Sequence, residues 1–337
     1  MNRFDYVRPS TVAEAIQALG SDPAARFIAG GTNLIDLMKY DVERPGKLID
    51  ITRLPLGEIE ERDGGLRIGA LVTNATVAYD ARIRERYPLL ADAILAGASA
   101  QLRNAASTGG NLLQRTRCYY FYDTATPCNK REPGSGCSAI GGVDRIHAIL
   151  GTSEHCIATH PSDMCVALAA LEATVQVSGP QGDRAIPFSD FHRLPGDNPA
   201  KDTNLAPGEI IVAIDLPANG FAGHHTYLKL RDRLSYAFAL VSVAAALELD
   251  GPTIRTARLA LGGVAHKPWR NREAEALLQG KPATRESFKA AADLILREAK
   301  PQSTNGFKIE LARRAIVRGL EQAAAGTPQS QSDKRIQ

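Results

Sequence analysis

Residues 26–39 read RFIAGGTNLIDLMK and combine three patterns. The apolar stretch Arg26–Ala29 predicts a strand, and Leu34–Lys39 has the apolar spacing of a helix. Between them, Ala29-Gly30-Gly31-Thr32-Asn33 places two glycines beside hydroxyl and amide side chains. Because glycine lets the backbone come close to a ligand, a loop of this composition between a strand and a helix suits phosphate binding.

A second glycine motif, Ser107-Thr108-Gly109-Gly110-Asn111, has the same composition. Neither motif has the G-x-G-x-x-G spacing of a Rossmann loop or the Gly-Lys-Ser/Thr of a P-loop. Two such loops suit a ligand with two phosphates. The alternative is that each is an ordinary tight turn.

The rest of the chain alternates helical and strand patterns, which predicts an α+β fold. The glycine- and proline-containing segment 217–225 predicts a domain boundary. We therefore expect a domain at 1–220, a smaller α+β domain at 224–325 and a disordered tail at 326–337. Within them we expect helices near 12–19, 89–100, 163–171, 285–300 and 307–325, and strands at 47–51, 66–71, 174–177, 210–216, 237–249 and 258–263, with regular structure resuming at 156–159.

Composition narrows the function classes. The 337 residues carry a net charge of +3, spread along the chain, which argues against nucleic acid as a partner. The longest apolar stretch, 236–247, is shorter than the roughly 20 residues of a membrane-spanning helix. Because the first residues lack a signal-peptide pattern, the default location is cytoplasmic. Periplasmic location by co-export with a signal-bearing partner stays open.

Five cysteines crowd one part of the chain, where residues 115–154 show no periodicity. A loop this long needs something to hold it. The cysteines are Cys118, Cys128, Cys137, Cys156 and Cys165. The first four suit zinc or an iron–sulfur cluster, with free thiols and disulfides as alternatives. Cys165 follows the helix-capping Ser162 in an apolar segment and is predicted to be a core residue.

Three histidines, His147, His155 and His160, are close enough in sequence to serve as substitute ligands. Arg115, Arg117, Lys130 and Arg131 surround the cysteines, and their positive charge would favour thiolates and a negatively charged cluster. Ordinary solvated or hydrogen-bonded side chains are the alternative for both groups.

The two glycine motifs, with Leu34 after the first and Arg103–Ala106 before the second, resemble the two FAD-binding motifs of the flavoprotein subunits of molybdenum hydroxylases. This family includes xanthine dehydrogenase, aldehyde oxidase and carbon monoxide dehydrogenase. The resemblance extends to about residue 322. It implies a two-subdomain FAD-binding domain of the vanillyl-alcohol-oxidase/PCMH type, with subdomains at about 1–53 and 54–220, followed by the smaller C-terminal domain with its small sheet and helices.

The resemblance also implies a role for each matching residue. The backbone of Ala29 to Asn33 would hold the FAD pyrophosphate, and Asp163 a polar arm of the cofactor. Lys229 would lie near the isoalloxazine ring and tune it. The alternatives are a helix-dipole carboxylate at Asp163 and an exposed strand lysine at Lys229. The implied FAD-binding residues are Ala29, Gly30, Gly31, Thr32, Asn33, Leu34, Ser107, Gly110, Asn111, Asp163, Ile211 (or Ile210) and Lys229.

In most of the family an aspartate follows the second motif closely, whereas here the matching Asp163 is displaced by an insertion at about 115–156. This insertion resembles the one that holds a [4Fe–4S] cluster in the FAD subunits of the bacterial periplasmic aldehyde oxidoreductase and of 4-hydroxybenzoyl-CoA reductase. Segments such as 236–241 (YAFALV) look closer to the former. The implied ligands are Cys118, Cys128, Cys137 and Cys156.

The family resemblance implies an electron-transfer subunit with no catalytic residue of its own for substrate oxidation. A molybdenum-cofactor large subunit would oxidise an aldehyde, and electrons would pass through a [2Fe–2S] small subunit and FAD to an external acceptor. A 4-hydroxybenzoyl-CoA reductase-like subunit is the alternative within the family. A zinc-stapled nucleotide-binding module is the alternative from another class.

Overall fold

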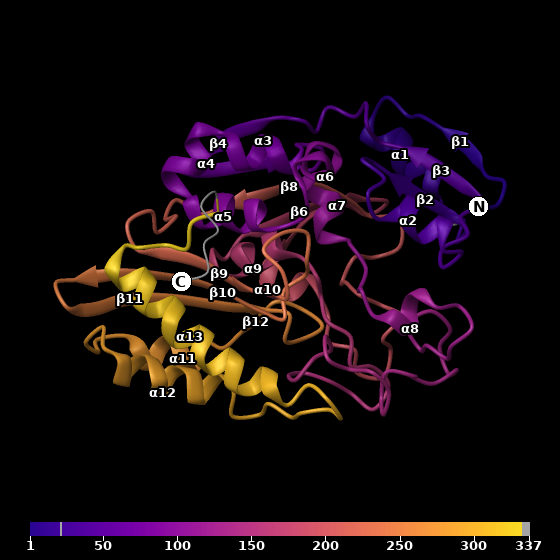
Figure 1. The fold of residues 1–337 in the computed structure, drawn as a ribbon. Helices are drawn as coiled ribbons and strands as arrows, with labels where there is room; N and C mark the ends of the chain where they lie inside the picture. Colours follow the sequence, from indigo (N-terminus) through magenta and orange to yellow (C-terminus); the bar gives the residue numbers. More distant parts are fainter. Residues whose placement is uncertain (21, 332–337) are drawn as a thin grey trace.

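A computed structural model of the chain describes residues 1–20 and 22–331. Within these residues the chain forms three sheets (Figure 1). The first is parallel, in the order β1-β3-β2, with the short helices α1 and α2 beside it. Its elements are β1 (Asp5–Val7), α1 (Val12–Leu19), β2 (Ala25–Ile28), α2 (Leu34–Lys39) and β3 (Lys47–Asp50).

The second sheet has five strands, and each neighbouring pair runs antiparallel. Its order is β4-β5-β8-β6-β7, so β8 returns from far along the chain to pair between β5 and β6. The strands are β4 (Ile59–Arg62), β5 (Gly65–Gly69), β6 (Thr174–Gly179), β7 (Gly182–Pro187) and β8 (Ile210–Leu216). The helices are α3 (Asn74–Tyr79), α4 (Ala81–Arg86), α5 (Pro88–Ala96), α6 (Ala100–Ala105), α7 (Thr108–Leu112), α9 (Asp163–Ala170) and α10 (Phe188–Phe191).

The third sheet belongs to the C-terminal part and has the order β12-β11-β10-β9. In Figure 1 the long helix α13 lies across this sheet, beside α11 and α12. The apolar residues of β10 and the helices form one continuous core. The elements are β9 (His225–Leu230), β10 (Val241–Asp250), β11 (Thr253–Gly262), β12 (Trp269–Arg270), α11 (Arg272–Leu278), α12 (Arg285–Ile295) and α13 (Phe307–Ala325).

Helix α9 joins the second and third sheets, because every one of its residues is buried. Ser162 caps the helix and accepts a hydrogen bond from the backbone N–H of Cys165. The core around α9 includes Tyr227 and Ala244 from the third sheet. Cys165 is fully buried there, which agrees with its predicted core position. The mixed α+β fold class is therefore confirmed.

Several local predictions were wrong. The second glycine motif, expected as a loop, is the capped helical turn α7. Residues 156–159 form only an isolated pairing between Ser153 and Cys156. The expected strand 237–249 begins at Val241, and β7 was missed.

The expected disordered tail is also partly wrong. Up to residue 331 it packs along β9, where the side-chain Oε1 atom of Gln329 accepts from the backbone N–H of Lys229. Gln331 donates to the carbonyl of Tyr227 at 3.2 Å. Residues 332–337 lie outside the described part of the chain.

The insertion 115–156 contains one short helix, α8 (Tyr119–Tyr122), and otherwise irregular backbone. Polar anchors hold it to the rest of the molecule. Asp144 is fully buried and accepts hydrogen bonds from the backbone N–H and the hydroxyl groups of Ser303 and Thr304. The buried Lys308 ammonium donates to the carbonyls of His147 and Gly263. Both anchors join the insertion to the segment that leads into α13.

We predict that Asp144→Asn destabilises the protein. Burial alone would raise the pKa of Asp144, but the hydrogen bonds from Ser303 and Thr304 outweigh it and lower the pKa below 3.8. An amide lacks the charge and donates where the carboxylate accepts, so the loss should be about 2 kcal/mol at pH 7. Urea unfolding monitored by circular dichroism gives the free energy of unfolding.

The pH dependence follows from the direction of that shift. A carboxyl with a lowered folded-state pKa stabilises the fold above its unfolded pKa and loses this contribution as the pH falls through the folded value. The difference between wild type and Asp144→Asn should therefore shrink below about pH 4. Glu154→Gln, an exposed neutralisation in the same insertion, is the control. Equal unfolding free energies for wild type and both variants at pH 7 would contradict the anchor.

Candidate functional site

The first cavity, of about 330 Å³, lies between the first and second sheets. Its walls come from the loop between β2 and α2, the start of α7 and the start of β8. Nine of the residues predicted to bind FAD line this cavity. They are Ala29, Gly30, Gly31, Thr32, Asn33, Leu34, Ser107, Gly110 and Ile211.

The backbone of the glycine loop offers unused donors to this cavity. The N–H groups of residues 30–33 find no acceptor in the part of the chain that the structure describes. The Asn33 side chain accepts from the backbone N–H of Arg115 at 2.9 Å, while its own NH₂ group is buried without a partner. Buried backbone and amide donors are normally paired. Only the Asn33 amide is buried, and residues 30–33 are half-buried or exposed, so their backbone N–H groups are free to donate to a ligand with several acceptor oxygens.

Packing explains the two glycines of the loop. A Cβ atom at Gly30 would lie 1.8 Å from the carbonyl oxygen of Ala105, so a side chain there would push the loop away from α6. Gly31 has φ of +71°, in the left-handed region that glycine tolerates. The loop is thus held close to the second glycine motif by close backbone contact.

The second glycine motif differs from the first because its backbone N–H groups are already hydrogen-bonded within the protein. Ser107 accepts from the N–H of Gly110 at 3.3 Å, and the other backbone N–H groups of 108–111 are already bonded to protein carbonyls. Asn111 donates to Asn74 at 2.7 Å and accepts from Ser162. A Cβ atom at Gly110 would meet only the Ser107 hydroxyl at 2.8 Å, and otherwise points into open space.

The second cavity, of about 470 Å³, adjoins the first and shares Thr32, Asn33 and Gly110 with it. The remaining predicted FAD-binding residues, Asn111, Asp163 and Lys229, line this second cavity. All twelve therefore surround two adjoining cavities, although they come from five separate segments of the chain.

Asp163 and Lys229 form a buried ion pair at the wall of the second cavity. The Lys229 ammonium lies 2.7 Å from the Asp163 carboxylate and also donates to the carbonyl of Ala96 at 3.1 Å. Tyr227 donates its hydroxyl to the other carboxylate oxygen at 2.7 Å. Burial and the negative charge of Asp163 hold the pKa of Tyr227 well above 10. Because the Lys229 side chain is only 2% exposed, the alternative of an exposed strand lysine was wrong.

Sequence reasoning missed further residues of this cavity. Arg103, Arg117 and Arg233 line it, against the carboxylates of Asp36 and Asp163. Together with Lys229, four cationic and two anionic side chains line the second cavity. Because the cationic side chains are in excess, the cavity favours a ligand that becomes negatively charged. Asn74 was missed as well, although its place in a polar segment before the second motif was a usable signal.

The four cysteines of the insertion come together. Cys118, Cys128, Cys137 and Cys156 line one small cavity, and all but Cys137 are buried. An isolated antiparallel pairing places Cys128 opposite Cys137. All five cysteines of the chain are free thiols. The buried Lys130 also lines this cavity, and its ammonium donates to the carbonyl of Pro199.

The distances between the four sulfur atoms and the pKa values of two of the thiols bear on which metal could bind here. Zinc held by thiolates needs sulfur atoms roughly 3.8 Å apart. Among the described residues, no three of these four thiols come within 4.8 Å of one another. Burial raises the pKa of Cys118 to about 12 and that of Cys156 to about 11. They therefore stay protonated unless a cation is bound.

The three histidines predicted as substitute ligands do not all lie near the four cysteines. His147 lies with its Nε2 atom 3.0 Å from the Cys118 sulfur, and the exposed His155 lines the same cavity as the four cysteines. His160 stacks on His192 instead, with ring centroids 4.4 Å apart and Cys165 nearby. His192 shares a hydrogen bond at Nε2 with the carbonyl of Leu112, and burial lowers its pKa to about 4. This histidine pair is neutral and packs in the interior.

Models of two protein families match the chain. The FAD-binding domain in molybdopterin dehydrogenase matches residues 2–219, and the C-terminal domain of the CO dehydrogenase flavoprotein matches residues 225–323. Among the described residues, no helix is both long and apolar enough to cross a membrane.

Relatives match along almost their full length. The aldehyde oxidoreductase FAD-binding subunit PaoB of Escherichia coli K12 is 53% identical, covering 96% of this chain and 99% of the relative. The glyceraldehyde dehydrogenase medium chain of Sulfolobus acidocaldarius is 29% identical, over 95% and 96%. A solved structure of carbon monoxide dehydrogenase from Hydrogenophaga pseudoflava superposes with a TM-score of 0.76 at 29% identity, covering 96% of this chain and 98% of the other.

The residues around the two cavities fit FAD. The loop donors of residues 30–33 lack acceptors, Gly110 leaves the passage between the cavities open, and cations surround the second cavity. This fit, the family models over both parts of the chain and the relatives all agree. The chain belongs to the family of FAD-binding flavoprotein subunits of molybdenum hydroxylases, and is an oxidoreductase subunit.

Proposed function

We propose that the first cavity holds the pyrophosphate and adenosine of FAD and that the second holds its isoalloxazine ring. The observation that carries this proposal is the set of unpaired N–H groups at residues 30–33, which face a cavity continuous with a cationic one. A pyrophosphate supplies the acceptors that these groups lack. Thr32, Asn33 and Gly110 line both cavities and would contact the middle of the cofactor.

Other residues would take roles at the two ends. Ser107 and Asn111 would contact the cofactor from the α7 side, and Ile211 in β8 would pack near it. Leu34 closes the apolar side of the first cavity. Asp163 is committed to Lys229 and Tyr227, so it would contact the cofactor while holding both side chains in place.

Lys229 would tune the cofactor by electrostatics. Bound FAD supplies an acceptor for electrons in pairs or singly, and its reduced ring carries negative charge. The ion pair with Asp163 leaves Lys229 with little net charge toward the ring. Much of the positive charge around the ring would then come from Arg103, Arg117 and Arg233, which line the same cavity.

We further propose that the chain is the electron-transfer subunit of a heteromeric aldehyde oxidoreductase. The 53% identical relative is named as the FAD-binding subunit of an aldehyde oxidoreductase, which supports this choice. A molybdenum-cofactor large subunit and a [2Fe–2S] small subunit would deliver the electrons, and an external acceptor would remove them. A 4-hydroxybenzoyl-CoA reductase-like role would instead run electrons toward the substrate, and flavin and cluster potentials distinguish the two.

The four cysteines of the insertion are proposed to hold a [4Fe–4S] cluster. Their sulfur atoms surround one cavity but are spread too widely for a closed zinc tetrahedron. Lys130 lines the same cavity, and a cation favours a negatively charged thiolate cluster. A zinc-stapled nucleotide-binding module remains the rival from another class, and a colourless protein with one zinc per chain would support it.

The domain division is proposed at 217–225, with the insertion at 115–156 as part of the first domain. The first family match ends at residue 219 and the second begins at residue 225, both within this segment, which supports the division. The compartment is proposed to be the cytoplasm, with periplasmic co-export as the alternative.

Gly110→Val should leave the protein folded but largely free of FAD. The added side chain would enter the passage shared by the two cavities while touching only the Ser107 hydroxyl, so its effect on packing should be small. Flavin absorbance per chain after purification should fall at least tenfold, a loss of roughly 1.4 kcal/mol or more in binding. Gly57→Val is the control, because a Cβ there meets nothing within 4 Å. Normal FAD content in Gly110→Val would refute the assignment of the passage.

Cys128→Ser should abolish the cluster while leaving FAD bound. Losing one thiolate of four leaves an incomplete ligand set, and the insertion should then become susceptible to protease because metal binding contributes folding energy. Iron and sulfide analysis should show close to four irons per chain in wild type and almost none in the variant. Cys165→Ala serves as the control, since that thiol is buried in the core away from the other four. Retention of iron in Cys128→Ser would show that a different ligand set is used.

A further inference from the structure

His160, Cys165 and His192 come together beside the start of α9. One ring nitrogen of each histidine and the Cys165 sulfur lie within 4.8 Å of one another. The three side chains come from different segments, since His160 precedes α9, Cys165 lies in its first turn and His192 follows α10. Two imidazole nitrogens and one sulfur gathered in this way are a set of metal ligands.

Each of the two rings has a buried nitrogen without a partner. Nδ1 of His192 and Nε2 of His160 make no hydrogen bond with the part of the chain that the structure describes. The two rings are in contact, with centroids 4.4 Å apart, and His192 is only 3% exposed. Buried polar atoms are normally paired, so two unpaired nitrogens on touching rings indicate a shared ligand.

The hydrogen bond of His192 prepares its ring for a metal. The Nε2 atom lies 2.8 Å from the carbonyl oxygen of Leu112, which can only accept. The ring therefore carries its proton on Nε2 and has a lone pair on Nδ1. Histidines that bind metals in proteins are oriented in the same way, because their other nitrogen donates to a carbonyl or a carboxylate.

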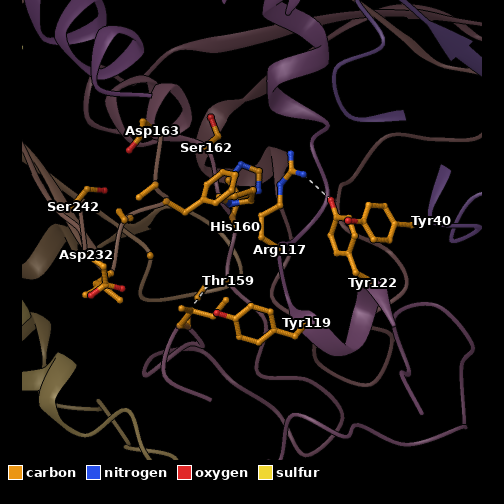
Figure 2. A pocket seen from close by; sticks show the side chains of 18 residues that line it. Tyr40, Arg117, Tyr119, Tyr122, Thr159, His160, Ser162, Asp163, Asp232 and Ser242 are labelled. Carbon is orange, nitrogen blue, oxygen red and sulfur yellow. Dashed lines mark hydrogen bonds between the residues drawn. The ribbon is translucent and has the colours of Figure 1, made fainter. Parts of the chain in front are cut away.

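The two histidines also border a place for a further ligand. Both line a cavity of about 190 Å³, which is large enough for water. On its other side His160 lines the cavity of about 460 Å³ shown in Figure 2, together with Arg117 and Ser162. Zinc sites with three protein ligands take water as the fourth.

The thiol is the source of negative charge at this group. Asp202 lines the smaller cavity, but its carboxylate is already paired with Arg115 and Lys130. Cys165 lies in the first turn of α9, where the helix dipole favours an anion. Metal binding would release the proton of this thiol to water and leave the thiolate as a ligand.

The ligand types select among the metals. Magnesium and calcium take oxygen ligands, and three ligands are too few for an iron–sulfur cluster. Two histidines and a cysteine also occur in blue-copper sites, which add a weak axial methionine. The adjacent Met164 is held elsewhere, because the Asn74 amide lies 3.7 Å from its sulfur. The group therefore favours zinc.

We propose that His160, Cys165 and His192 bind one structural zinc ion, with water as the fourth ligand. The ion would join the end of the insertion to α9 and to the segment after α10. Ligand atoms in a zinc tetrahedron of this kind lie roughly 3.3–3.6 Å apart, so small side-chain rotations would close the site. Because zinc has no redox chemistry, this site lies outside the electron path and does not depend on the FAD site proposed above.

Elemental analysis and zinc K-edge X-ray absorption of the full chain test the site. The protein is produced with zinc in the medium and purified without a metal-affinity resin. Wild type should hold about one zinc per chain, with one sulfur neighbour at about 2.3 Å and nitrogen or oxygen neighbours at about 2.0–2.1 Å. This spectrum reports on zinc alone, so FAD and iron in the same sample do not disturb it.

Two variants each remove one ligand. Cys165→Ala and His160→Phe, which keeps a ring to stack on His192, should each lower the zinc content about tenfold or more. Even the loss of an outer-shell partner weakens metal sites roughly 10- to 100-fold. The matched controls are His155→Phe, at an exposed histidine, and Cys128→Ser in the insertion. Both controls should keep the zinc, and flavin absorbance shows that each variant is folded.

The outcomes separate this site from the cysteines of the insertion. A wild-type chain without zinc, or with copper in its place, would overturn the proposal. Zinc with four sulfur neighbours, or zinc lost in either control and kept in Cys165→Ala, would overturn it too, because that ion would lie in the insertion. One zinc with a single sulfur neighbour, lost in Cys165→Ala and His160→Phe and kept in both controls, supports the site.

Discussion

The ion pair between Asp163 and Lys229 holds together the parts of the molecule on which the site depends. Asp163 opens α9, which packs between the second and third sheets, and Lys229 belongs to β9 of the third sheet. Both side chains are almost fully buried at a separation of 2.7 Å. Removing one partner from such a pair leaves a buried charge that costs about 3–5 kcal/mol. The Ala96 carbonyl and the Tyr227 hydroxyl complete the hydrogen bonding, so the pair fixes α5, α9 and β9 around the second cavity.

The insertion shows how irregular backbone can be ordered without a large core. Its apolar cluster is small and contains three buried cysteines with Phe121. Its order comes instead from buried charges bonded to backbone groups. Arg131 donates to three carbonyls of the insertion itself, Lys130 reaches Pro199 and Asp202, and Asp144 holds the segment before α13. Burial alone would raise the pKa of Asp202, but Lys130 and Arg115 lower it to about 2.

The sequence predicted the parts of the site that lie within continuous motifs. The segment 26–39 was predicted element by element, because its apolar pattern, glycines and helix spacing are all local. Residues that reach the site from elsewhere, such as Arg233 and Phe238, could not be placed, since nothing local marks a side chain that faces a cavity between domains. The second glycine motif was predicted as a loop because of its two glycines, although Ser107 before them is a helix-capping residue. Ser107 accepting from Gly110 is a local signal that favours a helical turn.

The position of the cysteines bears on what a cluster would do for the protein. Three of the four thiols already belong to the small apolar core of the insertion, and burial keeps the pKa of Cys118 and Cys156 far above neutrality. Thiols without a bound metal contribute little to holding a long irregular segment. Four metal–thiolate bonds would tie Cys118, Cys128, Cys137 and Cys156 together, and so close the insertion at both ends and in the middle. The same insertion supplies Arg117 to the second cavity, so a cluster that orders the insertion would also order that part of the wall without having to carry electrons itself.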